Sequence, residues 1–271
     1  MTNLQIDEVV NLAGYPIADG ANPARAALID RCRADLAANQ FCALPGFVTP
    51  TALSAMAAEA GELLPNAYHN NATRNCYLHR QGDPTFPPDH ARNLMDRSSV
   101  RMIAYDQVAT ESPLKTFYHS PIVRDLVADI IGEGELYDNE DPHQPANYVC
   151  YRHGDESSWH FDSGNSFTMT LMIQAADAGG EFQMSPNTRT DSHENYDHVA
   201  TVLRGGEDDQ VVSIARDVGE LCLFRGCNSL HRVAPVAGAT VRIMGVFVYE
   251  FTPGVIGDPE VNATIYGPRT R

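Results

Sequence analysis

The sequence predicts an α+β fold in which short antiparallel strands build the core and the N-terminal part supplies flanking helices. Apolar residues recur at helical spacing within residues 1–133, whereas short apolar runs bounded by Gly, Pro, Asn and Asp dominate residues 134–254. Hydrophobic residues make up 43% of the 271 positions, enough for a sizeable core, and no internal repeat is present. We therefore expect one domain spanning residues 1–271.

The N-terminal part, residues 1–133, is predicted to be mainly helical. Asn22 is a favourable N-cap, and Pro23 at the first helical position precedes apolar residues spaced four apart. Thr49-Pro50 gives a second start signal of the same kind. We expect helices from Asn22 to at least Leu36, from Thr49 to about Leu64 and over 112–132, with a short strand at 41–45.

Residues 65–97 separate the last two of these helices. This stretch is polar, holds four prolines and lacks apolar periodicity. It is predicted to be a long loop, and loops of this length often carry function.

The region 134–254 is predicted to be the β core. Its short strands and frequent turn residues are typical of a double-stranded β-helix, the jelly-roll or cupin type of fold. A helix is expected at 194–203, and residues 255–271 are expected to form a C-terminal tail. Strands are expected at 146–152, 166–175, 180–184, 210–215, 219–225, 230–236 and 240–251.

Composition excludes several classes of function. A formal net charge of −16 disfavours nucleic-acid binding, which requires a basic surface. No apolar run reaches the roughly 18 residues of a membrane span, and the first residues lack the pattern of a secretory signal. The six cysteines form no CxxC pair, so buried free thiols are expected rather than disulfides or a zinc site. We expect a cytoplasmic protein.

A metal site is predicted from a His-x-Asp motif. Two side chains two positions apart on a strand point to the same side, so both can reach one ion. The motif alone is weak: the chain has two matches, and its composition predicts about one by chance. His160-Phe-Asp162 precedes a strongly apolar strand, whereas His153-Gly-Asp155 has the character of a polar turn. We therefore choose His160 and Asp162.

The third ligand is expected from a later strand. His231 follows the apolar run Leu221–Phe224 and is the candidate. Two histidines and one carboxylate on one face of the ion are typical of non-heme iron oxygenases. Arg242 follows among apolar neighbours, where a buried cation needs an anionic partner such as the far carboxylate of 2-oxoglutarate.

Simpler interpretations exist for each residue taken alone. A single histidine is more often structural than catalytic, and Arg242 could pair with one of the 35 acidic residues. The order of the set, with His-x-Asp before a distal His and then an Arg, favours the functional interpretation.

At this point the sequence resembles a known family. Two segments carry the resemblance: Tyr148-Val-Cys-Tyr-Arg-His-Gly-Asp155 through Trp159-His-Phe-Asp162, and Gly219-Glu-Leu-Cys-Leu-Phe224 through Leu230-His-Arg-Val-Ala-Pro-Val236. They are similar to 2-oxoglutarate oxygenases that include the free-lysine halogenases and related amino-acid hydroxylases. The similarity extends from about residue 40 to 254.

The resemblance implies an activity and its cofactors. It implies iron(II), 2-oxoglutarate and O₂ as cofactors, with succinate and CO₂ as co-products. Halogenating members have glycine where this chain has Asp162, so the resemblance implies hydroxylation of an unactivated C–H bond. The expected substrate is a small polar molecule, a free amino acid by resemblance. A homodimer stays open beside a monomer.

The resemblance also suggests supporting residues. Tyr151 is expected to hydrogen-bond 2-oxoglutarate, with a core tyrosine as the alternative. The loop 65–97 becomes a candidate substrate lid, in which Arg74 could bind a substrate carboxylate or be an ordinary solvated side chain. Trp159, Arg189 and Asp106 receive no assigned role, although Trp159 fits core packing best.

Two other functions stay open. One is a metal-dependent cupin enzyme that does not use 2-oxoglutarate, which would have no need of a buried Arg242. The other is a non-catalytic metal- or ligand-binding β domain, which would release no succinate.

Overall fold

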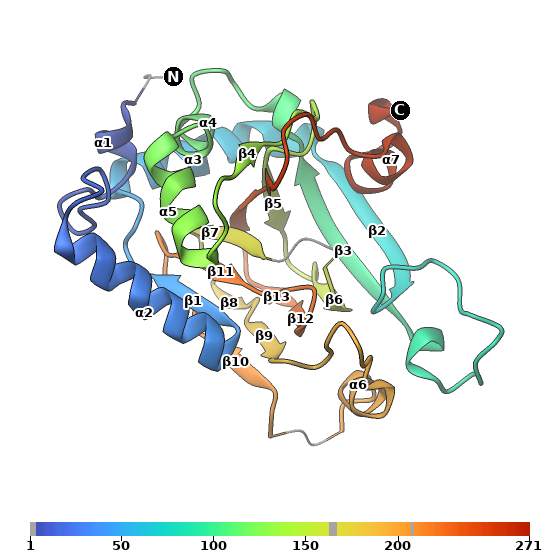
Figure 1. Ribbon diagram of the computed structural model, residues 1–271. Helices are drawn as coiled ribbons and strands as arrows, with labels where there is room; N and C mark the ends of the chain where they lie inside the picture. The colour runs from blue at the N-terminus through green and yellow to red at the C-terminus, as the bar shows by residue number, and fades with distance from the viewer. Residues whose placement is uncertain (1–3, 163–166, 207–208) are drawn as a thin grey trace.

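The helices of the chain lie mainly before residue 132. A computed structural model describes residues 4–162, 167–206 and 209–271 and confirms the α+β class (Figure 1). The described α-helices are α1 (Ile6–Val9), α2 (Pro23–Asn39), α3 (Pro50–Leu63), α4 (Pro113–Tyr118), α5 (Pro121–Ile131), α6 (Tyr196–Leu203) and α7 (Pro259–Tyr266). Short 3-10 helices are η1 (Leu64–Asn66), η2 (Ala91–Asn93), η3 (Tyr105–Gln107) and η4 (Pro268–Thr270).

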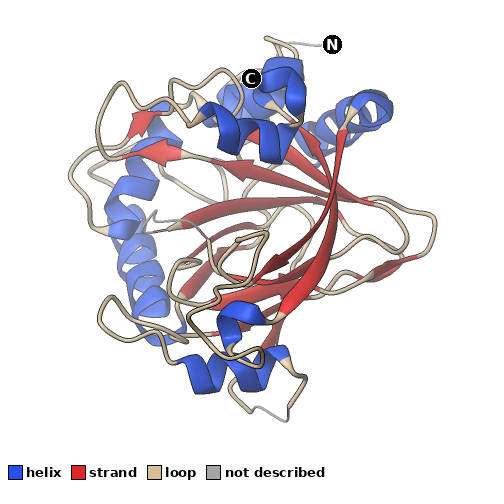
Figure 2. Cartoon of the chain, turned by 90° about the vertical axis from the view of Figure 1, so that its right-hand side faces the viewer, coloured by secondary structure: helices blue, strands red, loops and turns tan. Residues whose placement is uncertain are grey.

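The strands form two main sheets, as the double-stranded β-helix prediction requires (Figure 2). The larger has the order β1-β11-β7-β14-β5-β3-β2 and the smaller β10-β9-β12-β6, with antiparallel pairing throughout. The strands are β1 (Phe41–Leu44), β2 (Tyr68–Asn75), β3 (Met95–Ile103), β4 (Tyr137–Asp138), β5 (Ala146–Tyr151), β6 (Ser157–His160), β7 (Thr168–Gln174), β8 (Ala178–Gly179), β9 (Phe182–Ser185), β10 (Val212–Ile214), β11 (Leu221–Phe224), β12 (Leu230–Val233), β13 (Val236–Ala237), β14 (Arg242–Phe247) and β15 (Tyr249–Glu250).

The two faces of the large sheet have different neighbours. One face packs against α2 to α5 in the main hydrophobic core, where Leu171 and Leu221 are fully buried. The other face meets the small sheet, and Tyr151 and Phe224 pack there with Phe182 of the small sheet. The helices therefore hold the sheet from outside and leave the space between the sheets for a cavity.

The predicted helix starts are confirmed by their caps. The Asn22 side chain accepts a hydrogen bond from the Ala24 N–H, and the Thr49 hydroxyl accepts one from the Ala52 N–H. The single helix expected at 112–132 is wrong, because α4 ends before Ser120 and α5 begins at Pro121. Ser120 has an extended backbone, as steric contact with a following proline favours.

The expectation of a long loop at 65–97 is wrong in part. Strand β2 lies inside this stretch and pairs along its whole length with β3, which begins at Met95. Main-chain hydrogen bonds form the pair, so it needs no apolar repeat. The mainly helical N-terminal part thus also supplies β1, β2 and β3 to the large sheet, and the core is not confined to residues 134–254.

The expected C-terminal tail contains helix α7. Asp258 caps it by accepting from the Glu260 and Val261 N–H groups, with Pro259 at its first position. Its Tyr266 packs with Met102 of β3, and α7 lies beside β2 and β3 (Figure 1). Residues 255–271 therefore form part of a wall of the molecule rather than a trailing segment.

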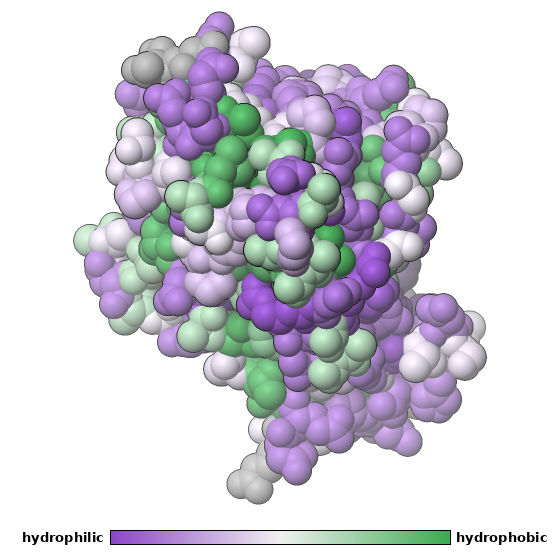
Figure 3. All heavy atoms as spheres, turned by 60° about the vertical axis from the view of Figure 1, so that its left-hand side comes forward, coloured by the Kyte–Doolittle hydropathy of each residue, from purple (hydrophilic) through white to green (hydrophobic). Residues whose placement is uncertain are grey.

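The surface and the cysteines agree with the composition. Figure 3 shows the side that carries α1 and α2, where hydrophilic residues are interspersed with smaller hydrophobic areas. All six cysteines are free thiols, and five of them are buried, as expected. Within the described ranges, no helix combines the length and apolar character needed to cross a bilayer.

A buried carboxylate joins three elements of the fold. Glu59 of α3 is 1% exposed. Its Oε2 accepts hydrogen bonds from the Ser112 hydroxyl at 2.5 Å and the Tyr148 hydroxyl at 2.6 Å, and its Oε1 accepts from the Ala109 N–H at 3.2 Å. Burial and the charge of Glu59 hold the pKa of Tyr148 well above its usual range. Glu59 therefore connects α3 to strand β5 and to the start of α4.

We expect Glu59→Ala to lower the free energy of unfolding by about 2–4 kcal/mol, because it leaves two buried hydroxyls unpaired and opens a small cavity. Chemical denaturation measures the change. Glu62→Ala, an exposed position on the same helix, is the matched control and should change stability by no more than about 0.5 kcal/mol. Equal losses in the two variants would contradict the role of Glu59.

Candidate metal centre and active site

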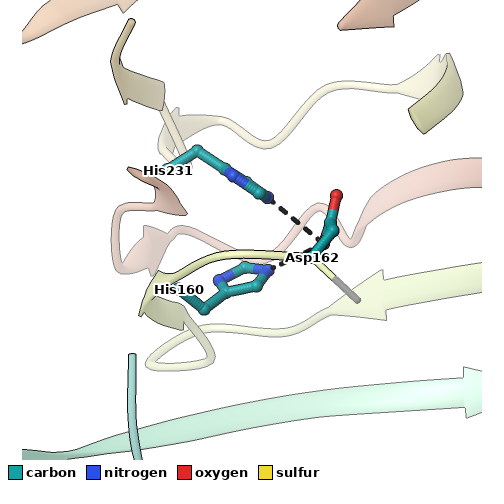
Figure 4. A group of neighbouring side chains, drawn as sticks. All are labelled: His160, Asp162 and His231. Carbon is teal, nitrogen blue, oxygen red and sulfur yellow. Dashed lines mark ion pairs between the residues drawn. The ribbon is translucent and has the colours of Figure 1, made fainter. Parts of the chain in front are cut away.

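The predicted metal ligands converge at one point between the sheets. His160 ends β6, His231 lies on β12, and the two are direct partners in the antiparallel pairing of these strands. The Oδ1 atom of Asp162 lies 3.5 Å from Nε2 of each histidine. Figure 4 shows both imidazole rings directed toward this carboxylate.

Both imidazoles are held so that Nε2 is free to bind. Nδ1 of His160 lies 2.8 Å from the Ser158 carbonyl oxygen, and Nδ1 of His231 lies 2.9 Å from that of Ser229. A carbonyl only accepts, so Nδ1 carries a proton, and Nε2 is the nitrogen that a metal ion would bind after displacing any proton there. This is the usual arrangement of metal-binding histidines.

Asp162 is positioned by contacts from two other segments. Its Oδ2 accepts a hydrogen bond from the Thr168 hydroxyl at 2.5 Å, and its N–H donates to the Gly226 carbonyl at 3.1 Å. A Cβ atom on Gly226 would lie only 2.0 Å from Oδ2, so the carboxylate needs a glycine there. Burial would raise the pKa of Asp162, but the neighbouring His231 and His160 outweigh it and hold that pKa well below its usual range.

The three residues fit a divalent metal ion. In the part of the chain that the structure describes, they form the one group of three or more His, Cys, Asp or Glu whose ligand atoms all lie within 4.8 Å of one another. Two imidazoles and one carboxylate that occupy one face of the metal's coordination sphere are the ligand set of many non-heme iron(II) oxygenases. Their open side faces a cavity.

The rival motif His153-Gly154-Asp155 has a structural role. Gly154 has a φ of +78°, and His153 is exposed. Asp155 is buried, accepts a hydrogen bond from the Ser99 hydroxyl at 2.5 Å and pairs with Arg101. This aspartate is therefore already satisfied within the protein, and the choice of His160 and Asp162 agrees with the geometry.

The cavity next to the three ligands has a volume of about 340 Å³ and is lined by both sheets and by α7. Arg242 and Tyr151 line its inner end and are direct partners on β14 and β5. The Arg242 guanidinium lies 5.3 Å from the centre of the Tyr151 ring. Both sequence-predicted cofactor residues thus share one cavity with the metal ligands.

Arg242 is a buried cation that lacks a counter-ion. It is 2% exposed, and its Nη1 atom has no hydrogen-bond partner among the described residues. Burial lowers its pKa to about 10. An unpaired buried guanidinium is costly, so its surroundings fit an anionic ligand. A Cβ atom on Gly180 would lie 2.8 Å from the Arg242 Cδ, so this glycine makes room for the side chain.

Sequence reasoning missed Arg216, which lines the same inner end. Its Nε lies 2.5 Å from a carboxylate oxygen of Glu220, and it also donates to the Thr170 hydroxyl at 3.2 Å. The signal was available, since Arg216 and Glu220 carry opposite charges four residues apart beside a buried strand. Arg216 is neutralised by Glu220, whereas Arg242 has no carboxylate partner among the described residues.

Arg74 also lies on the cavity, but on a strand rather than on a loop. It belongs to β2 and lines the outer end together with Asn70. The lid expected at 65–97 therefore contains part of the cavity wall itself.

Three residues without an assigned role have structural contacts outside the cavity lining. Trp159 is buried and packs beneath the Arg232 guanidinium, as the core interpretation expects. Arg189 stacks on Phe161 and donates to the Cys227 carbonyl. Asp106 binds Arg269 through two hydrogen bonds and so fixes the segment after α7.

Comparison with known proteins identifies the family. The sequence matches the family Halogenase D over residues 24–255, and the chain belongs to this family. No curated protein sequence matches significantly.

Several solved structures share the fold. They include a 2OG-Fe(II) oxygenase family oxidoreductase from Burkholderia pseudomallei, with 16% identity, coverage of 84% of this chain and 92% of the other, and a TM-score of 0.51. A Trichoplax adhaerens prolyl hydroxylase bound to a hypoxia inducible factor peptide has 16% identity, coverage of 83% of this chain and 90% of the other, and a TM-score of 0.53. The epimerase SnoN, solved with Fe³⁺, alpha ketoglutarate and nogalamycin RO, has 13% identity, coverage of 86% of this chain and 93% of the other, and a TM-score of 0.57. These similarities establish the double-stranded β-helix fold.

We expect His160→Ala and His231→Ala to weaken iron(II) binding by more than about 100-fold, since loss of a group that merely orients a ligand already costs roughly 10- to 100-fold. Anaerobic calorimetry measures the affinity. His153→Ala removes the histidine of the rival motif and serves as the control, with unchanged affinity. Wild-type affinity in both ligand variants would refute the assignment.

Proposed function

We propose that the protein is an iron(II)- and 2-oxoglutarate-dependent dioxygenase that hydroxylates a C–H bond of a small substrate, a free amino acid. The observation that carries the proposal is the convergence of the Asp162 carboxylate with His160 and His231. Membership of an oxygenase-fold family of halogenases supports the same class of chemistry. We further propose that residues 1–271 act as one cytoplasmic oxygenase domain, since strands from both halves of the chain build the cavity.

Asp162 favours hydroxylation over halogenation. A halogenating site must leave one ligand position for the halide, and here the protein supplies a carboxylate at that place. Thr168 and Gly226 are arranged around this carboxylate, which supports its role as a ligand rather than as an incidental neighbour.

The cofactors are iron(II), 2-oxoglutarate and O₂. His160, Asp162 and His231 would hold the metal, and Arg242, with Tyr151 beside it, would bind the far carboxylate of the keto acid. Bound together, they supply the chemistry that couples oxidative decarboxylation to insertion of one oxygen atom into a C–H bond. The chain's own part is to orient the ligands, to supply the cation and to exclude water with Phe182, Phe224 and Val233.

The two alternative functions fit less well. A metal cupin that uses no keto acid gives no reason for an unpaired guanidinium at the inner end of the cavity. A non-catalytic binding domain does not require two imidazoles with fixed tautomers and an open metal face.

We expect Arg242→Met to weaken 2-oxoglutarate binding by about 100-fold, as expected when one partner of a buried charge pair is removed. Without 2-oxoglutarate, the variant should be at least as stable as wild type, because a buried unpaired charge is replaced by an apolar side chain of similar length. Anaerobic titration measures binding, and thermal unfolding measures stability. Unaltered 2-oxoglutarate affinity in the folded variant would contradict this role.

The test of the function is succinate release with iron(II), ascorbate, 2-oxoglutarate and each of the twenty amino acids in turn. Reactions run with and without chloride, and mass analysis follows the amino acid. We expect gain of one oxygen atom regardless of chloride. A chlorinated product would overturn the hydroxylase assignment, and absence of substrate-stimulated succinate with every amino acid would overturn the proposed substrate.

A further inference from the structure

Arg74 is the cation at the outer end of the cavity that the protein leaves without a carboxylate. Its Nη2 donates to the Asn70 side-chain oxygen at 3.2 Å, while its buried Nε has no hydrogen-bond partner among the described residues. None of the ion pairs within the described ranges includes it. Partial burial, and then the charge of Arg80, lower its pKa. A half-buried guanidinium in this state fits an anion brought by a ligand.

Three neighbouring arginines differ from Arg74, because they either have a carboxylate partner or lie outside the cavity. Arg101, on the paired strand β3, has Asp155 as its carboxylate partner. Arg216, in the same cavity, has Glu220. Arg97 pairs across from Thr73, so its side chain lies on the face of the hairpin away from Arg74, and it is exposed.

The described lining of the cavity contains one carboxylate, Asp162, and we assign that one to the metal. This is unusual for a chain with 35 acidic residues and a net charge of −16. A second cationic group on a substrate would have to leave water without a counter-ion, which is costly. The cavity as described therefore discriminates against side-chain ammonium and guanidinium groups.

Much of the remaining cavity lining is apolar. It includes Val100 and Met102 of β3, Val149 of β5 and Ile265 of α7. The hydroxyls of Ser98 and Ser158 are hydrogen-bonded to each other at 2.7 Å. The Asn75 amide is used within its own turn, where its oxygen accepts from the Tyr77 and His79 N–H groups.

We infer that the primary substrate is a carboxylic acid with an uncharged, mainly aliphatic body, whose carboxylate binds Arg74 and whose C–H bonds face the metal ligands. This inference rests on the proposed function and narrows it. Among free amino acids it selects those with neutral aliphatic side chains and rejects lysine, ornithine and arginine.

The first test measures binding rather than turnover. Trp159, the only tryptophan in the chain, adjoins His160, and the titration follows its fluorescence. Anaerobic protein loaded with iron(II) and 2-oxoglutarate is titrated with valine, leucine, isoleucine and methionine, with their amides, and with the three cationic amino acids. We expect at least one neutral amino acid to bind at least about 10-fold more tightly than its own amide and than each cationic one. Preference for a cationic amino acid overturns the inference.

The second test combines protein and ligand changes. Arg74→Gln should weaken binding of the best acid by about 10- to 100-fold. It should leave the affinity of the corresponding amide nearly unchanged, because the amide already lacks the carboxylate that Arg74 would bind. Arg97→Gln removes one positive charge from the other face of the hairpin and should change neither affinity. Equal losses for acid and amide would show that Arg74 acts only structurally.

Failure of this inference can be told apart from failure of the proposed function. If lysine stimulates succinate release and yields a hydroxylated product, the hydroxylase stands and the substrate class is wrong. If the neutral amino acids bind through Arg74 but no oxygenated product forms, the binding site stands and the proposed reaction is wrong.

Discussion

The site depends on the register between β6 and β12, two strands whose paired histidines lie 71 positions apart in the sequence. His160 and His231 are direct partners, and a slip of one residue would turn one imidazole to the opposite face of the sheet. Strand β9 pairs with the other edge of β12, with Met184 opposite His231, and so fixes β12 from both sides. The carbonyls of Ser158 and Ser229 then orient the rings, so backbone pairing sets both position and protonation.

The cavity of this acidic protein is lined by two arginines that lack a carboxylate partner among the described residues. At a net charge of −16 the long-range field repels anions, but it is screened over about 8 Å at physiological ionic strength. Inside the cavity the dielectric is lower and single charges count for more. Arg242 and Arg74 both line this cavity, and in the proposed function and the further inference each of them binds one carboxylate.

Local pattern and residue order were sufficient to predict the three residues that converge at the candidate metal centre, but not the cavity wall formed by β2 and α7. His160, Asp162, His231 and Arg242 lie on or beside apolar strands, so their polarity was conspicuous in the sequence. Strand β2 has polar residues on both of its faces. One face lines the cavity and the other faces solvent, so the strand shows no alternation of apolar and polar residues. Helix α7 and Glu59 gain their roles only from partners distant in the sequence, which are Met102 for α7 and Tyr148 for Glu59.

The surroundings of Asp162 bear on the reaction as much as the residue itself. If position 162 were a glycine, the Thr168 hydroxyl would lose its hydrogen-bond acceptor, and no side chain at position 162 would fill the space beside Gly226. The Thr168 hydroxyl and the absence of a Cβ atom at Gly226 are therefore both matched to a carboxylate at position 162. A carboxylate held in this way can complete the facial set of metal ligands with a protein oxygen and occupies the place that a halide would need, which is the physical argument for the hydroxylation that we propose.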